Sequence, residues 1–269
     1  KFKPNYISSN LTYIKIKWKL FYIMIIIAIL KLGIPSVCIV YYLLSYCKFK
    51  YGKIYYNDNM TITAHTGCNG KEPNSIASLE DGYKSGAQIL EFDLYFDKNG
   101  VPYLSHNELK GGEIKLEEAF KFFINNPGVK GNIDVKKVDY MSTVFDLITS
   151  YNLSDRVFFT GVEEKFVEAV KYGCPGIPYY LNYKPKFLKI NSQQYINELV
   201  NIVKKAGAIG INMNHYFLSE KLIKIFHEKG LLVSVWTLNE EYYMFRAIYY
   251  GPDNITTQKP SKLMHLIRQ

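Results

Sequence analysis

The chain has 269 residues, of which 48% are apolar and 16% aromatic, and its net charge is +9. This is enough for the core of one large domain but leaves little for a second. The charge is uneven, because residues 1–60 hold nine lysines and one acid, Asp58, while the rest of the chain sums to +1. A nucleic-acid-binding protein would carry its basic excess on the folded domain, so we expect no nucleic-acid partner.

A long apolar segment, residues 20–46, follows a basic segment, residues 1–19. It has 27 residues and one charge, Lys31, whereas a membrane span needs about 20 apolar residues. Lys31 costs roughly 3 kcal/mol on insertion, which the many aliphatic residues outweigh. We therefore predict a transmembrane helix over residues 20–46 and a linker over residues 47–60. Five lysines precede the span and three follow, which favours a cytoplasmic N-terminus and an extracytoplasmic catalytic domain.

Two alternatives for this segment are a cleaved signal peptide and a lipoprotein signal. The apolar stretch is longer than a usual signal core, and no small-x-small cleavage site follows it. The sequence "LSYC", which ends at Cys47, resembles a lipoprotein cleavage box except for the bulky Tyr46. Cys38 and Cys47 lie in or beside the span, so Cys68 and Cys174 could form at most one disulfide.

From residue 61 onward, β-rich runs alternate with amphipathic segments that end at glycines such as Gly86, Gly207 and Gly230. The eight candidate strands are 62–66, 89–96, 132–136, 157–162, 177–183, 208–213, 231–238 and 254–257, and helical patterns cover 75–85, 116–125, 140–151, 193–205 and 219–229. This alternation predicts an α/β protein with a (β/α)8 TIM barrel over residues 61–269. A doubly wound open sheet is the second candidate fold.

The stretch "EFDLYFDKNGVPYLSHN", residues 91–107, combines a strand with unusual polar residues. Glu91 and Asp93 share one strand face, opposite the apolar side chains between and after them. Asn99-Gly100 is a typical turn, so the chain should fold back antiparallel and bring His106 nearly opposite Glu91. The hairpin therefore predicts a histidine beside two carboxylates.

Other ionisable residues follow strands at the same predicted end of the barrel. His65 ends the first strand, and Asp134 and Lys136 share one face of the third. Three carboxylates without a cysteine cluster suit Ca²⁺ or Mg²⁺, and two histidines can serve as general acid and base for a phosphodiester. Each of these residues could also have a plain structural role, as a rim histidine, a solvated loop residue or an acid paired with lysine.

Several ordered motifs resemble those of the glycerophosphodiester phosphodiesterase family, within the phosphatidylinositol phospholipase C-like superfamily. His65-Thr66-Gly67 resembles its HRG motif, Glu91-Phe92-Asp93 its ExD motif, and "NGVPYLSHN" its DGxPVxxHD motif. Asp134-Val135-Lys136 resembles ExK, "VSVWTLN" at 233–239 resembles VxVWTxN, and "GPDNITTQKP" at 251–260 resembles GxDxIxTDxP. The resemblance spans roughly residues 61–260 and implies a (β/α)8 barrel.

The resemblance also implies residue roles. His65 and His106 would be the acid-base pair, Glu91, Asp93 and Asp134 the ligands of a divalent cation, and Lys136, Asn74 and Trp236 the substrate contacts. Asn74 and Ser75 could equally cap a helix, and Trp236 could be simple core. The chain departs from the family pattern where Thr66 replaces an arginine, Asp134 a glutamate, and Asn107 and Gln258 aspartates. The PENT loop of the family is here "EPNS", residues 72–75, so its glutamate is either missing or displaced to Glu72.

These observations predict a single-pass membrane enzyme that hydrolyses a glycerophosphodiester or a lysophospholipid to an alcohol and a phosphomonoester, using Ca²⁺ or Mg²⁺. A phospholipase D-type or lyase reaction that forms a cyclic phosphate would use the same residues. A non-catalytic barrel that binds phospholipid headgroups is the alternative from another functional class.

Overall fold

The structure, a computed structural model, describes residues 23, 34–51, 57 and 59–268 of two compact units, Lys1–Gly52 and Lys53–Gln269. The first unit contains helix α2, Ile34–Tyr51. Of the predicted span over residues 20–46, residues 20–22 and 24–33 lie outside the described residues. Among the helices that are described, none combines the length and apolar character needed to cross a membrane.

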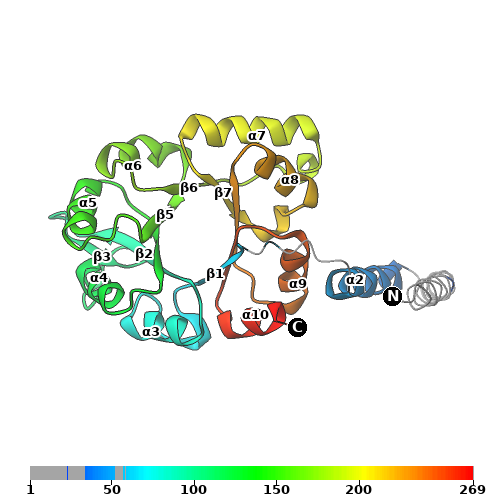
Figure 1. Cartoon of the computed structure of the whole chain (residues 1–269), viewed down its shortest axis with the longest axis horizontal. Coiled ribbons are helices and arrows are strands. Elements are labelled where there is room, and N and C mark those ends of the chain that lie inside the picture. The colour runs from blue at the N-terminus through cyan, green and yellow to red at the C-terminus, as the bar shows by residue number, and fades with distance from the viewer. Residues whose placement is uncertain (1–22, 24–33, 52–56, 58, 269) are drawn as a thin grey trace, which may run out of the picture. The chain divides into compact units, whose positions relative to one another are not determined.

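The second unit is a closed barrel of eight parallel strands (Figure 1). The strands are β1 (Thr61–Ala64), β2 (Ile89–Phe96), β4 (Lys130–Val135), β5 (Val157–Val162), β6 (Tyr179–Asn182), β7 (Gly210–Asn214), β8 (Leu232–Trp236) and β9 (Asn254–Thr257). Each pairs with the next, and β9 pairs with β1 to close the ring. The predicted barrel is confirmed, and the alternative of an open doubly wound sheet is wrong. The predicted hairpin is also present, because β3 (Pro102–Leu104) runs antiparallel to β2.

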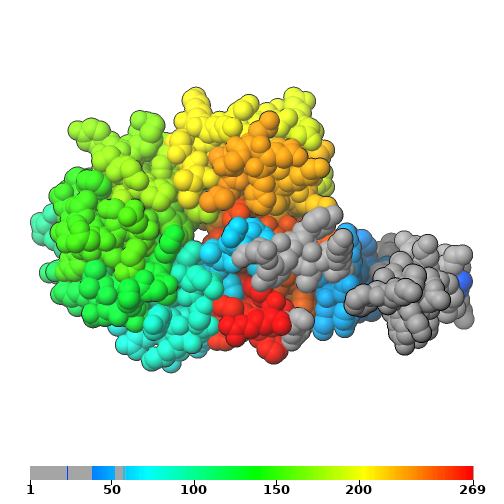
Figure 2. All heavy atoms as spheres, viewed as in Figure 1, coloured from blue at the N-terminus to red at the C-terminus, as the bar shows by residue number. Residues whose placement is uncertain are grey.

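Helices surround the barrel, as Figure 1 shows. In the space-filling view, the atoms of these segments form the outer surface of this unit (Figure 2). They are α3 (Ile76–Lys84), α4 (Leu116–Asn125), α5 (Met141–Ser150), α6 (Val167–Gly173), α7 (Gln193–Ala206), α8 (Glu220–Glu228), α9 (Glu241–Tyr250) and α10 (Pro260–Ile267). Ser75, Ser192 and Ser219 cap α3, α7 and α8, each accepting a hydrogen bond from a backbone N–H of the first turn. Ser75 thus has the capping role. Short 3₁₀ turns, Cys68–Gly70, Glu164–Phe166, Phe187–Lys189 and His215–Phe217, lie in the loops after β1, β5, β6 and β7.

Side chains of the strands alternate between two environments. Apolar residues such as Phe92, Ile133 and Phe159 point outward and are fully buried under the helices. Inside the barrel, Ile89, Phe158 and Tyr180 form a separate apolar layer. Above that layer the interior becomes polar toward the carboxyl ends of the strands, which is where the candidate site lies. The four cysteines, Cys38, Cys47, Cys68 and Cys174, are all free thiols.

Candidate active site

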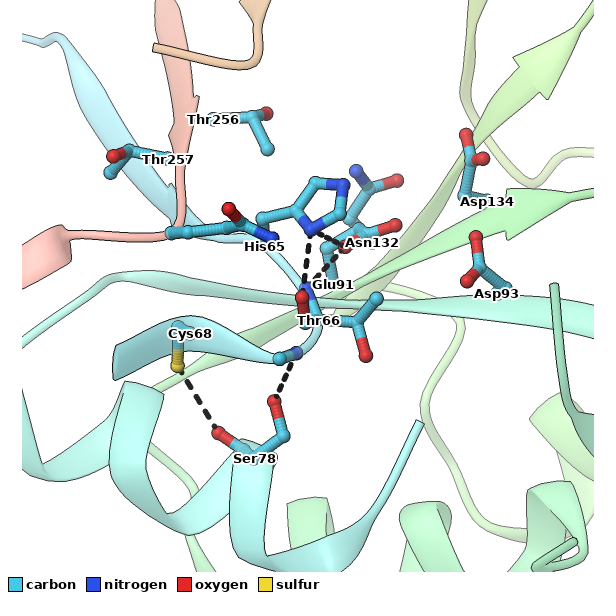
Figure 3. Close-up of polar contacts among 12 residues, drawn as sticks. His65, Thr66, Cys68, Ser78, Glu91, Asp93, Asn132, Asp134, Thr256 and Thr257 are labelled. Atoms are coloured by element: carbon cyan, nitrogen blue, oxygen red, sulfur yellow. Dashed lines mark hydrogen bonds and ion pairs between the residues drawn. The ribbon is translucent and has the colours of Figure 1, made fainter. Parts of the chain in front are cut away.

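Strand register brings the predicted carboxylates together. Asp93 on β2 is the direct partner of Asp134 on β4, which in turn is the partner of Thr160 on β5. Figure 3 shows Asp93 and Asp134 side by side on adjacent strands, with the His65 ring near Glu91. Because residues in register on parallel strands share a face, the charges at positions 91, 93 and 134 converge on one end of the barrel interior.

Glu91 is buried, with 5% of its surface exposed. Its Oε2 atom accepts a hydrogen bond of 2.6 Å from the backbone N–H of Thr66 and lies 3.9 Å from His65 Nδ1. Burial, followed by repulsion from Asp93 and Asp134, raises the pKa of Glu91 well above its ordinary value. The site therefore places a buried carboxylate close to two others, which disfavours the ionised form of Glu91.

Asp93 is held from several sides. Asn74 Nδ2 donates to its Oδ2 at 2.9 Å, while Lys136 Nζ and His106 Nδ1 lie 3.1 and 3.3 Å from its Oδ1. The Asp93 backbone N–H donates to Asn74 Oδ1 at 2.9 Å, so the Asn74 side-chain amide is hydrogen-bonded to both the carboxylate and the backbone of Asp93. The backbone N–H of Ser105 also donates to the backbone carbonyl of Asp93 at 3.1 Å. The antiparallel hydrogen bonding of the hairpin therefore continues to the residue just before His106.

The hairpin delivers His106 to the site, as expected, but with a different partner. The predicted neighbour was Glu91, whereas the contact that the structure gives is with Asp93. The reason is the register, in which Leu94 pairs with Leu104, so that the histidine lies near position 92 and reaches the adjacent carboxylate. The ring is 62% exposed at the rim of the site.

Asp134 and Lys136 lie close together, as predicted. Lys136 Nζ bridges Asp134 Oδ2 and Asp93 Oδ1, and the Thr160 hydroxyl lies 2.7 Å from Asp134 Oδ1. Although burial lowers the pKa of Lys136, the two carboxylates more than offset this and raise it above its usual range. The carboxylates are thus paired with a lysine inside the site rather than with lysines at its rim.

Glu91, Asp93 and Asp134 have the composition of a site for a hard cation. One oxygen from each lies within 4.8 Å of the others. A calcium ion with oxygen ligands at about 2.4 Å can bridge such a spacing. The three residues therefore fit a divalent metal, with open positions left for water and substrate oxygens.

A cavity of about 250 Å³ leads to these carboxylates. His65, His106, Lys136 and Trp236 contribute to its walls, and Trp236 is 36% exposed, so it is not simple core. Further lining residues that the sequence analysis missed are Asn132, Thr160, Asn182, Asn212, Thr237 and Thr256. Most of them occupy inward positions of the strands, so strand periodicity applied to neutral polar residues would have found them.

Thr66 and Asn74 form a support behind the carboxylates. The Thr66 side chain is buried, and its Oγ1 accepts a 2.6 Å hydrogen bond from the Asn74 backbone N–H. Asn74 lines a neighbouring groove rather than the 250 Å³ cavity, and its side chain contacts Asp93. The position where the family pattern has an arginine is therefore occupied by a neutral side chain that is used within the protein.

Comparison with known proteins extends this description. Residues 107–262 match the glycerophosphoryl diester phosphodiesterase family. The chain is 23% identical to a glycerophosphodiester phosphodiesterase of Caldanaerobacter subterraneus, over 77% of this chain and 98% of that protein. It is 19% identical to human lysophospholipase D GDPD3, over 77% of this chain and 84% of that protein.

Solved structures share the fold. A phosphodiesterase of Oleispira antarctica, in complex with the product sn-glycerol-3-phosphate, superposes with a TM-score of 0.62 at 17% identity, over 78% of this chain and 97% of that one. The family match excludes residues 65–106, so the motifs around His65 and Glu91 rest on the structure described above. Because the match nevertheless covers more than half of the chain, this protein belongs to the glycerophosphoryl diester phosphodiesterase family of phosphoric diester hydrolases.

Proposed function

We propose that this protein hydrolyses a glycerophosphodiester or a lysophospholipid to an alcohol and a phosphomonoester. A divalent cation would be held by Glu91, Asp93 and Asp134, with His65 and His106 as the acid-base pair. The observation that carries the proposal is a cluster of three carboxylates at the carboxyl ends of the strands, of which Glu91 and Asp134 line one cavity together with two histidines and one lysine. Active sites of (β/α)8 enzymes lie at this end of the barrel.

The charges of the site support a divalent cation. Among the described residues, the three carboxylates have one ammonium group beside them, that of Lys136, and burial followed by repulsion from Asp93 and Asp134 raises the pKa of Glu91. Two positive charges would restore balance and favour the ionised form of Glu91. Oxygen donors without cysteine favour Ca²⁺ or Mg²⁺. When bound, such a cation would neutralise charge on the phosphoryl oxygens of the substrate.

The surroundings of the two histidines favour different roles. His65 Nδ1 lies 2.8 Å from the carbonyl oxygen of Thr66, an acceptor, so this nitrogen carries the proton of a neutral ring. Nε2 is then free to accept a proton, which suits a general base. His106 Nδ1 lies 3.3 Å from the Asp93 carboxylate, and its exposed ring stands at the wall of the cavity, where it can reach the leaving oxygen as the general acid.

The relatives support the substrate class. The Oleispira antarctica protein was solved with sn-glycerol-3-phosphate as product, and the human relative is named a lysophospholipase D. Both names fit a substrate in which a glycerol phosphate is joined to a second alcohol. Lys136, which now bridges two carboxylates at the cavity wall, is the described cation best placed to contact the substrate phosphate.

The direct test is turnover of glycerophosphocholine and lysophosphatidylcholine by the full chain with Ca²⁺ or Mg²⁺, before and after chelation, with products identified by mass. His65→Ala and His106→Ala should each lower kcat by about 100-fold or more. His227→Ala is the matched control, because His227 pairs with Asp253 outside the catalytic cavity. Equal turnover in all three variants would refute the histidine roles. A cyclic phosphate would indicate the lyase reaction, and binding without turnover would favour the headgroup-binding alternative.

A further inference from the structure

The loop after β6 exposes an unusual set of side chains. Within residues 184–189, three lysines are exposed, and between them Phe187 is 66% and Leu188 is 96% exposed. Exposed single apolar residues are common, but two neighbouring ones enclosed by cations are a more specific pattern. Because the loop follows a barrel strand, it lies at the carboxyl end of the strands, as does the candidate active site.

The backbone of this loop is fixed. Pro185 and Ile190 are buried on either side of the exposed pair, and the backbone N–H of Lys186 donates to the Tyr195 hydroxyl at 2.8 Å. Phe187 packs edge to face on Phe217 with 6.4 Å between ring centroids. These contacts hold the loop in a conformation in which Phe187 and Leu188 are exposed.

The loop carries unbalanced positive charge. Lys184, Lys186 and Lys189 make no ion pair with any residue that the structure describes, whereas Lys165 on the preceding loop pairs with Glu163 at 2.8 Å. The sequence contains no acidic residue between positions 168 and 198. The loop thus combines three available cations with two apolar side chains.

A groove connects this loop to the site. Tyr183, Lys184 and Phe217 help to line a groove of about 690 Å³, which shares Asn182 and Trp236 with the catalytic cavity. A single-chain lipid can bring its phosphate to the carboxylates in two ways. It either passes Asn182 and Trp236, which the groove and the cavity share, or enters from the opposite side of the cavity. Through Lys184 the loop therefore borders a groove that has two wall residues in common with the catalytic cavity.

We propose that the loop of residues 184–189 docks on an anionic lipid surface and holds the cavity there for a lysophospholipid substrate. Phe187 and Leu188 would enter the boundary between headgroups and acyl chains, and the lysines would contact lipid phosphates. Nucleic acid fits less well, because Leu188 offers neither a stacking face nor a hydrogen bond. The lipid substrate rests on the proposed function, whereas the docking itself does not.

The first experiment measures docking directly in the full chain. In a Trp18→Phe background, Leu188→Trp places a reporter at the loop tip, and Tyr172→Trp is the matched control. Tyr172 is 93% exposed near the end of α6, which runs back toward the opposite end of the barrel. Vesicles of brominated phosphatidylcholine with about a quarter phosphatidylserine should quench the reporter at 188 at least twofold more than the one at 172. Equal quenching at the two positions would overturn the proposal.

A second experiment tests the consequence for turnover. Phe187→Ser combined with Leu188→Ser should lower activity on vesicle-bound lysophosphatidylcholine about tenfold and leave activity on soluble glycerophosphocholine unchanged. An equal loss on both substrates would overturn the role in presenting substrate. Quenching at position 188 without turnover of either substrate would support docking while refuting the proposed function, so the two failures can be told apart.

Discussion

Asn74 offers the sharpest test of how the carboxylates are positioned. Its amide group donates to Asp93 Oδ2 and accepts from the Asp93 backbone N–H, both at 2.9 Å, while its own backbone has a φ of 57°. Replacement by alanine removes both contacts and leaves the left-handed backbone in place. Replacement by glycine removes the same contacts but relieves the backbone.

The expected magnitudes separate the two effects. Loss of an outer partner of a metal ligand typically lowers metal affinity or activity by about 10- to 100-fold. We expect this loss in both Asn74→Ala and Asn74→Gly, because Asp93 loses the same partner in each. The free energy of unfolding should differ between them, with alanine about 1 kcal/mol less stable because of its positive φ.

Titration calorimetry with Ca²⁺ and with Mg²⁺, and the dependence of kcat/KM on each cation, measure the first effect, and urea denaturation without added cation measures the second. A glycine variant with the cation affinity of the wild type would refute the idea that Asn74 positions Asp93. An alanine variant as stable as the glycine variant would refute the assigned backbone strain. Ser85→Ala on the far end of α3 is a control for general effects of substitution near this helix.

Two further predictions concern stability. Burial, with a smaller effect from Arg246, lowers the pKa of His215 from 6.5 to about 4, so the unfolded chain takes up a proton between these pH values that the folded chain does not. The free energy of unfolding should therefore fall by about 2 to 3 kcal/mol as the pH falls from 6.5 to 4, and His215→Gln should flatten this dependence in urea denaturation. Gly161→Ala should destabilise by more than about 3 kcal/mol, because φ is +73° and a Cβ would lie 2.4 Å from the Val135 carbonyl oxygen. Gly176→Ala, with φ +81° and open space, should cost only about 1 to 2 kcal/mol, and equal thermal shifts in the two alanine variants would contradict the clash.

The parts of the fold that the sequence predicted are those with strong local signals. The β2–β3 hairpin follows from the Asn99-Gly100 turn, and the barrel follows from the regular alternation of strands and helices. The contact of His106 with Asp93 depends on a shift of about one residue in the hairpin register, which turn chemistry alone does not determine. The local sequence pattern therefore predicted which residues form the site, but not that His106 contacts Asp93 in place of Glu91.

The neutral polar residues of the cavity could not be singled out in this way. Asn132 and Thr160 differ little in sequence from any polar residue in a strand, and their importance appears only when register places them beside Glu91 and Asp134. Lys136 was expected to contact phosphate, and its bridge between two carboxylates depends on the pairing of β2 with β4. The register between strands that are distant in the chain follows from a single sequence only indirectly.

Charge balance links the missing arginine to the roles proposed for the remaining cations. With three ionised carboxylates, Lys136 and a divalent cation, the site would be neutral before substrate binds. A phosphodiester adds one negative charge, and Thr66, whose hydroxyl is bound to the Asn74 backbone, offers no charge to oppose it. In its proposed role of general acid, His106 would bring its proton, and with it a positive charge, to the wall of the cavity beside Asp93. In this site the general acid would therefore also supply the electrostatic contribution that an arginine supplies in the family pattern.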